Sequence, residues 1–222
     1  TDEFIKYMGY KSIPENFKER RKIAYKLIKQ GYKLNGVPGF FKDKQNNWTF
    51  TGVSGYLIPV IDNQGRIQGF QIRRFVEKGK YIWFSSSGKK EGTASETFIN
   101  FTGSNKNKPF VIVEGVLKSQ VCSYLKPTAN YIGIPGTFAI KLLINELKEN
   151  NIENVFIAFD MDKLNNKYVL KAETNLKNKL KENNINYQIF NWSLSKGKGL
   201  DDFLLNVILS KRIKNDNICY NY

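Results

Sequence analysis

Two kinds of hydrophobic pattern alternate along the second half of the chain: short continuous apolar runs, and longer stretches with apolar residues at helical spacing. Residues 110–113 and 155–159 are continuous apolar runs, typical of strands buried on both faces of a parallel sheet. The stretches between such runs carry apolar residues at helical spacing. Strands that alternate with helices in this way predict a parallel α/β sheet flanked by helices. The expected strands are 110–113, 131–134, 154–159 and 186–191, and the expected helices are 116–125, 137–149, 165–183 and 200–209.

The first hundred residues predict one amphipathic helix and several short strands. Residues 12–31 are expected to form the helix, because Ser12-Ile13-Pro14-Glu15 fits a capping box. Residues 55–61 and 66–74 flank the turn Asp62-Asn63-Gln64-Gly65 and predict a β-hairpin. Further short strands are expected at 48–50 and 81–84, which makes this half a small α+β subdomain. The predicted division is therefore residues 1–101 and 102–222.

The composition excludes several kinds of chemistry. Histidine is absent from the 222 residues, which excludes Ser-His-Asp and Cys-His nucleophiles and histidine-ligated zinc. The two cysteines, Cys122 and Cys219, are too few for a zinc ribbon or a disulfide framework. Apolar runs fall far short of the ~20 residues of a membrane helix, and Thr1–Tyr10 lacks the pattern of a signal peptide. We expect a cytoplasmic protein with no membrane partner.

The chain is strongly basic, with 35 Lys and Arg against 20 Asp and Glu and a net charge of +15. Such an excess favours a polyanionic partner, most often nucleic acid. A lysine- and asparagine-rich proteome is the simpler alternative explanation of the charge.

Acidic residues follow the predicted strands directly. Glu114 follows the strand 110–113, and Asp160 and Asp162 follow the strand 154–159. Asp201 and Asp202 come after the strand 186–191 and a glycine-lysine loop. Ligands of open α/β sheets bind beyond the carboxyl ends of the strands, and oxygen-only ligand sets select hard cations such as Mg²⁺ or Mn²⁺. The pattern indicates metal-assisted phosphoryl chemistry.

This ordered set of acids resembles the Toprim domain of bacterial primases, topoisomerases and some nucleases. The motifs are Val111-Ile112-Val113-Glu114-Gly115, Ala158-Phe159-Asp160-Met161-Asp162 and Lys198-Gly199-Leu200-Asp201-Asp202, and the resemblance covers about residues 108–210. It implies a Toprim-type parallel sheet in which Glu114, Asp160 and Asp162 are the catalytic and metal-binding residues. Glu114 would also act as general acid or base, and Asp201 and Asp202 would complete a Mg²⁺ or Mn²⁺ site.

The predicted hairpin is similar to the segment that precedes Toprim in bacterial primases. Its pattern runs from Pro59 through Asp62, Gly65 and Arg66 to a later Lys80-Tyr81. The whole chain therefore resembles the RNA-polymerase core of a primase, closest to the compact Toprim proteins of plasmids and phages. The resemblance implies single-stranded DNA and nucleoside triphosphates as partners. The implied nucleotide- or DNA-binding residues are Arg66, Arg73, Lys80, Lys118, Lys196 and Lys198.

Two features depart from the primase pattern. Bacterial primases usually have Asp four positions after the Glu of the Glu-Gly motif, and this chain has Lys118 there. The zinc-binding and helicase-contacting domains are also missing from the sequence, so a partner chain or a longer protein would supply them. Because Thr1 is not a start methionine, we expect a processed chain or a fragment.

Three functions are compatible with these patterns. The favoured one is a DNA primase-like nucleotidyltransferase in the replication of a plasmid, phage or other mobile element. A Toprim nuclease would use the same acids to hydrolyse DNA. A non-catalytic DNA-binding accessory protein is the third, and Lys118 adds weight to it.

Overall fold

The computed structural model describes residues 1–164 and 167–219 and contains two compact units. The first unit comprises Thr1–Val60 and Ile67–Thr97, and the second comprises Ile61–Arg66 and the chain from Phe98 onward. The boundary between the two units follows Thr97, a few residues before the predicted division at 101. It lies earlier because Ile99 and Phe101 are buried in the core of the second unit. The division into domains 1–101 and 102–222 stays a prediction.

The second unit is built on a five-stranded sheet in the order β11-β10-β8-β9-β7. The three pairings among β11, β10, β8 and β9 are parallel, and β7 is an antiparallel edge strand. The predicted α/β fold with a parallel sheet is therefore confirmed. The strands are β7 (Asn100–Phe101), β8 (Phe110–Glu114), β9 (Asn130–Ile134), β10 (Asn154–Ile157) and β11 (Asn186–Ile189).

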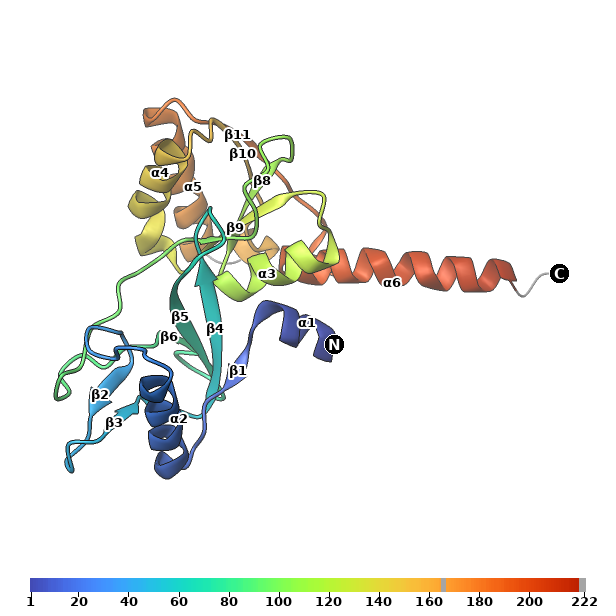
Figure 1. Ribbon diagram of the computed structural model, residues 1–222. Helices are drawn as coiled ribbons and strands as arrows, with labels where there is room; N and C mark the ends of the chain where they lie inside the picture. Colours follow the sequence, from blue (N-terminus) through green and yellow to red (C-terminus); the bar gives the residue numbers. More distant parts are fainter. Residues whose placement is uncertain (165–166, 220–222) are drawn as a thin grey trace. The chain divides into compact units, whose positions relative to one another are not determined.

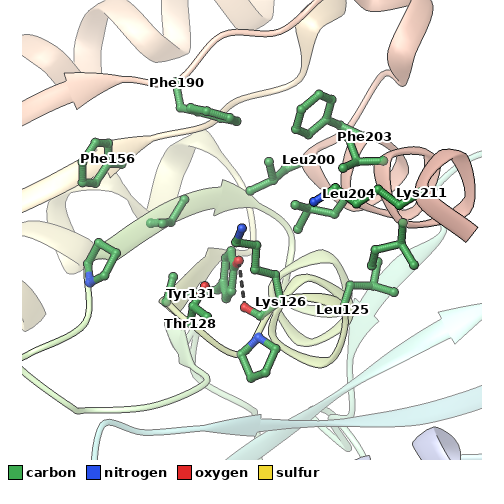
Figure 2. A pocket seen from close by; sticks show the side chains of 16 residues that line it. Leu125, Lys126, Thr128, Tyr131, Phe156, Phe190, Leu200, Phe203, Leu204 and Lys211 are labelled. Carbon is green, nitrogen blue, oxygen red and sulfur yellow. Dashed lines mark hydrogen bonds between the residues drawn. The ribbon is translucent and has the colours of Figure 1, made fainter. Parts of the chain in front are cut away.

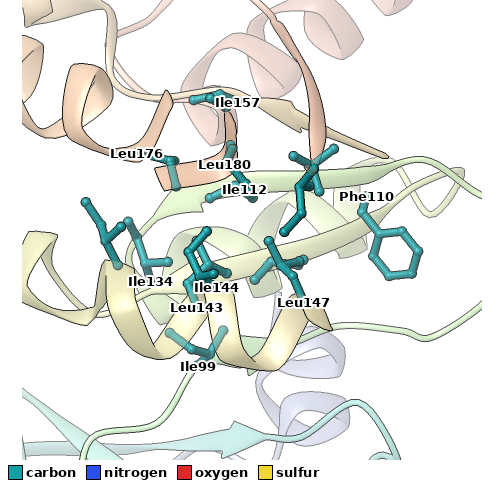
Figure 3. Close-up of a cluster of buried hydrophobic side chains, with 14 of the residues drawn as sticks. Ile99, Phe110, Ile112, Ile134, Leu143, Ile144, Leu147, Ile157, Leu176 and Leu180 are labelled. Atoms are coloured by element: carbon teal, nitrogen blue, oxygen red, sulfur yellow. The ribbon is translucent and has the colours of Figure 1, made fainter. Parts of the chain in front are cut away.

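Helices cover both faces of this sheet, as Figure 1 shows. Successive side chains of a strand point to opposite faces. Phe110 and Ile112 of β8 therefore join the core beneath α4 and α5 (Figure 3), whereas Val113 joins Cys122 of α3 and Leu204 of α6 on the other face. The helical elements are α3 (Val116–Leu125), η1 (Thr137–Ala139), α4 (Ile140–Glu149), η2 (Met161–Leu164), α5 (Lys167–Glu182), η3 (Leu194–Lys196) and α6 (Leu200–Cys219).

The first unit contains a four-stranded sheet in the order β1-β4-β5-β6 and a separate ribbon of β2 and β3. Its core joins Ile13, Ile72, Phe50 and Phe84, and the rings of Phe50 and Phe84 are 6.0 Å apart. The elements are α1 (Asp2–Met8), β1 (Lys11–Ser12), α2 (Phe17–Lys29), β2 (Phe40–Lys42), β3 (Trp48–Phe50), β4 (Gly55–Ile61), β5 (Ile67–Arg74) and β6 (Tyr81–Trp83).

The predicted helix over 12–31 is wrong at its start. Ser12 lies in β1 opposite Tyr56 of β4, so its backbone is extended and cannot begin a helix. Asn16 is the N-cap instead, and its side-chain oxygen accepts a hydrogen bond of 2.9 Å from the Lys18 N–H. The predicted hairpin is confirmed, since β4 and β5 are neighbours in the sheet and the Gly65 N–H donates to the Asp62 carbonyl.

Within the described ranges, none of the helices combines the length and apolar character needed to cross a bilayer. The Cys122 thiol is buried, and burial raises its pKa far above the ordinary value. The side chain of Cys219 lies outside the described residues.

Candidate active site

Glu114 is the last residue of β8, where the strand gives way to α3. Gly115 follows with φ of 96°, a left-handed conformation that residues with a β-carbon rarely adopt. Its N–H donates to the Ile134 carbonyl of the neighbouring strand at 2.7 Å. The Glu-Gly pair therefore turns the chain sharply and leaves the Glu114 carboxylate at the carboxyl edge of the sheet.

Asp160 lies on the loop that follows the adjacent strand, β10, and Asp162 lies in the short helix η2 that comes next. The Asp160 N–H donates to Glu114 Oε1 at 3.3 Å, which joins the first two predicted motifs directly. The Met161 N–H donates to the Lys198 carbonyl at 2.9 Å, which joins the second motif to the third. Three segments distant in sequence thus meet at one edge of the sheet, as the sequence predicts.

The third motif supplies Asp201 and Asp202 from the start of α6. Asp202 Oδ2 accepts a hydrogen bond from the Gly199 N–H at 3.1 Å, which is the contact that the third residue of a helix makes in a capping box. Asp201 Oδ1 is buried and has no hydrogen-bond partner among the described residues. The two acids therefore differ in environment: Asp202 accepts a hydrogen bond from the Gly199 N–H, whereas Asp201 Oδ1 is buried without such a partner in the described structure.

Two lysines neutralise the acids of the second motif. The Lys118 amine of α3 pairs with Asp160 Oδ1, and both side chains are largely buried. Lys198 Nζ lies 2.7 Å from Asp162 Oδ2, in a pair whose lysine side chain is 57% exposed. The hydrogen bond from Lys198 to Asp162, followed by the attraction of the neighbouring carboxylates, raises the pKa of Lys198.

Glu114 and Asp201 both have raised pKa values. Burial is the main cause for Glu114, and the negative charge of Asp160 adds to it, whereas Lys118 opposes the shift. Burial is again the main cause for Asp201, with Lys118 opposing and Asp202 reinforcing the shift. Each carboxyl group therefore holds a proton more tightly than an exposed carboxyl group does.

The oxygen-only donor set fits a hard cation. Asp162 Oδ1, like Asp201 Oδ1, is buried without a hydrogen-bond partner in the described structure, and a cation would satisfy such an oxygen. The described residues nevertheless hold no group of three or more Asp, Glu, Cys or His side chains gathered closely enough to bind a metal ion. The amines of Lys118 and Lys198 instead contact the acids of the second motif.

The remaining basic residues of the prediction lie in different places. Arg66, at the hairpin turn within the second unit, pairs with Asp62 at 2.7 Å. Lys196 is exposed at the end of η3, shortly before α6. Arg73 and Lys80 belong to the first unit, where Arg73 lies over the Tyr81 ring at 5.2 Å and Lys80 is exposed. Their predicted contacts with nucleotide or DNA stay predictions.

A groove of about 1050 Å³ opens beside Glu114 and runs along α5. Phe138, which is 70% exposed, and the α5 side chains of Lys171 and Asn175 line it. The sequence prediction missed these residues, although Thr137 and Phe138 follow β9 at the same edge of the sheet as the acids. The rule that ligands bind beyond the carboxyl ends of the strands, here called the strand-end rule, located Glu114 and would also have located Phe138.

A second cavity, of about 680 Å³, lies on the other side of the unit and is shown in Figure 2. Aromatic and aliphatic side chains of the sheet and of α6 line it, including Tyr131, Phe156 and Phe203. The Tyr131 hydroxyl donates to the Lys126 carbonyl at 3.1 Å at one side of this cavity.

A buried polar network supports the base of the site. Asn100 is fully buried, and its Nδ2 donates to Ser119 Oγ of α3 at 2.9 Å. Its Oδ1 accepts hydrogen bonds from the Ile61 N–H at 3.0 Å and from Gln120 Nε2 at 3.3 Å. The network fixes the first turns of α3, directly after Glu114. Sequence analysis assigned Asn100 no role, because a single asparagine in a short edge strand gives no distinctive pattern.

A family model described as Domain of unknown function (DUF3854) matches residues 98–208, which is half of the chain. The chain belongs to this family. The matched segment holds all three acidic motifs and the sheet that positions them. A search of curated proteins finds no match.

Solved structures of bacterial primases are similar to this chain along nearly its whole length. The zinc-binding and RNA polymerase domains of the Aquifex aeolicus primase match with a TM-score of 0.67 and 17% identity, over 97% of this chain and 53% of that one. The RNA polymerase domain of Mycobacterium tuberculosis primase DnaG, in complex with double-stranded DNA, matches with a TM-score of 0.61 and 15% identity, over 95% and 68%. A DNA primase domain from Pseudomonas aeruginosa matches with a TM-score of 0.56 and 14% identity, over 93% of this chain and 67% of that one.

These likenesses show that the chain has the fold of bacterial primase catalytic cores. The chain spans about half of the Aquifex aeolicus structure that it matches. At such low identity the likeness concerns the fold, so activity is argued from the residues of the site.

Proposed function

We propose that the protein is a primase-like nucleotidyltransferase that joins nucleotides on a single-stranded DNA template. The observation that carries the proposal is the hydrogen bond from the Asp160 N–H to Glu114 Oε1, together with the Lys198 carbonyl that accepts from the Met161 N–H. These contacts bring the acids of three distant motifs to the edge of an α/β sheet where ligands bind. The primase fold of the chain supports the same conclusion.

In the proposed reaction the 3′-hydroxyl oxygen of one nucleotide attacks the α-phosphorus of the next. The new phosphodiester bond forms as the bond to pyrophosphate breaks, and the hydroxyl proton is lost. The Glu114 carboxylate, at the edge of the sheet beside Asp160, is the group assigned to take that proton. Lys198, more than half exposed, offers positive charge to the phosphate oxygens.

A divalent ion, Mg²⁺ or Mn²⁺, is part of the proposal. Glu114, Asp160 and Asp162 would hold it, with Asp201 and Asp202 nearby, and it would stabilise the negative charge that develops on the transferred phosphate. The template and the nucleoside triphosphates are the proposed ligands of the basic surface. A zinc-binding domain and a helicase are proposed to act from other chains or other segments, in the replication of a plasmid, phage or other mobile element.

Two assays separate this proposal from its rivals. Incubation with a single-stranded template, labelled ribonucleotides and Mg²⁺ should give short labelled products. Labelled DNA incubated with Mn²⁺ and no nucleotides should stay intact. Cleavage of that DNA without any synthesis would instead favour a nuclease. DNA binding with neither reaction, and with no Mn²⁺-dependent thermal shift, would favour the accessory protein.

A further inference from the structure

Lys118 occupies a position that disfavours a positive charge. It is the third residue of α3, and the first turn of a helix carries the positive end of the helix dipole. Its side chain is only 17% exposed, so water does little to offset this repulsion. A buried positive charge is costly unless nearby anions pair with it.

Two carboxylates from different parts of the chain lie near the amine. The Lys118 amine pairs with Asp160, whose side chain is 13% exposed. Asp201 approaches from the start of α6, and Gly199 lies against both groups. A β-carbon built on Gly199 would stand 2.9 Å from Lys118 Nζ and closer still to Asp201 Oδ1. The amine is therefore paired with Asp160 and lies near Asp201 Oδ1, and its positive charge offsets the repulsion between the two acids.

We propose that the Lys118 ammonium takes the place of a divalent cation between Asp160 and Asp201. The chain itself then neutralises this half of the site, and one divalent ion is left to Glu114, Asp162 and the second carboxylate oxygen of Asp160. The inference rests on the proposed function in assigning a divalent ion to those neighbouring carboxylates. It implies that this protein binds one divalent ion fewer than the same site would with a carboxylate at position 118.

Two variants of the full chain test the inference. Lys118→Asp replaces the ammonium group with a carboxylate that can bind a metal ion. An aspartate is also favoured in the first turn of a helix, where the helix dipole is positive. Lys118→Met removes the charge and keeps much of the side-chain volume. Lys141→Asp is the matched control, because it makes the same exchange at an exposed position of α4. Mn²⁺ binding is counted by electron paramagnetic resonance, and thermal unfolding is followed with EDTA and with Mn²⁺.

Lys118→Asp should bind one more equivalent of Mn²⁺ than the wild type and the control do. Lys118→Met should unfold about 5 °C or more below the wild type in EDTA and should recover much of that loss in Mn²⁺. If Lys118→Asp does not fold, the recovery of the Lys118→Met unfolding midpoint in Mn²⁺ alone tests the inference. An unchanged Mn²⁺ count in folded Lys118→Asp, or a Lys118→Met midpoint equal to that of the wild type in EDTA, overturns the inference.

Primer synthesis by the wild type is measured separately. An additional Mn²⁺ in Lys118→Asp without any synthesis by the wild type would uphold the inference and contradict the proposed function. Synthesis by the wild type with an unchanged Mn²⁺ count in Lys118→Asp would uphold the proposed function and contradict the inference.

Discussion

Lys198 is joined to the Asp160–Asp162 loop in two independent ways. Its Nζ lies 2.7 Å from Asp162 Oδ2, and its backbone carbonyl accepts the Met161 N–H at 2.9 Å. The backbone contact holds the glycine-lysine loop against the site, and the exposed side chain adds a positive charge. Because only the side-chain contact depends on the residue type, the two can be separated by substitution.

Lys198→Met should change the free energy of unfolding by less than about 1 kcal/mol, because the ion pair is exposed and the backbone contact remains. It should strengthen Mn²⁺ binding, since the amine no longer competes for the Asp162 carboxylate. Urea unfolding and a Mn²⁺ titration measure the two effects. Lys196→Met in the same loop leaves the pair intact and should change neither. Weaker Mn²⁺ binding in Lys198→Met would contradict the idea that the amine and Mn²⁺ compete for the Asp162 carboxylate.

Gly199→Ala should destabilise the protein by about 1–3 kcal/mol, because the added β-carbon would crowd Lys118 Nζ and Asp201 Oδ1. Lys118→Ala should relieve part of this crowding. A double-mutant cycle in urea unfolding should therefore give a coupling free energy of about 1 kcal/mol between the two positions. Strictly additive effects would mean that the amine does not lie against the glycine.

Asn100→Ala should cost about 2–4 kcal/mol of unfolding free energy, because it leaves buried groups of Ile61, Ser119 and Gln120 without their hydrogen-bond partner. Chemical denaturation measures the loss. Asn107→Ala, at an exposed position, should change the unfolding free energy by less than about 0.5 kcal/mol. Equal stability of the two variants would show that the buried network contributes nothing.

Asp62→Asn should destabilise the hairpin turn in a pH-dependent way. Burial alone would raise the pKa of Asp62, but its hydrogen bonds with the Arg66 N–H, the Arg66 guanidinium and the Gln64 N–H outweigh burial and lower it. The ionised carboxylate therefore contributes stability above its unfolded-state pKa of about 4. That contribution disappears as the pH falls through the lower pKa of the folded state.

The deficit of Asp62→Asn should be about 1 kcal/mol at pH 7, since Arg66 is exposed, and should shrink steadily as the pH falls below about 4. Urea unfolding of both proteins at pH 7 and in acid tests this. A deficit that is as large in acid as at neutral pH would show that the charge of Asp62 is irrelevant.

Local patterns predicted the elements that position the acids. The continuous apolar runs of β8 and β10 identified buried parallel strands, and the strand-end rule placed Glu114 and Asp160 at one edge. Features that depend on packing between distant segments escaped prediction. The Lys118–Asp160 pair joins residues 42 positions apart and depends on how α3 lies on the sheet. Ser12 fitted a helix cap, yet its pairing with Tyr56 overrode the local signal.

Primer synthesis by the wild type and by the double variant Asp160→Ala, Asp162→Ala tests the central claim most directly. Each is incubated with single-stranded DNA, ribonucleotides and Mg²⁺, and Asp2→Ala, at an exposed position of α1, is the control. The wild type and the control should make primers, and the double variant should lose activity by about 100-fold or more while staying folded. Full synthesis by the double variant would contradict the assignment of these acids to nucleotidyl transfer.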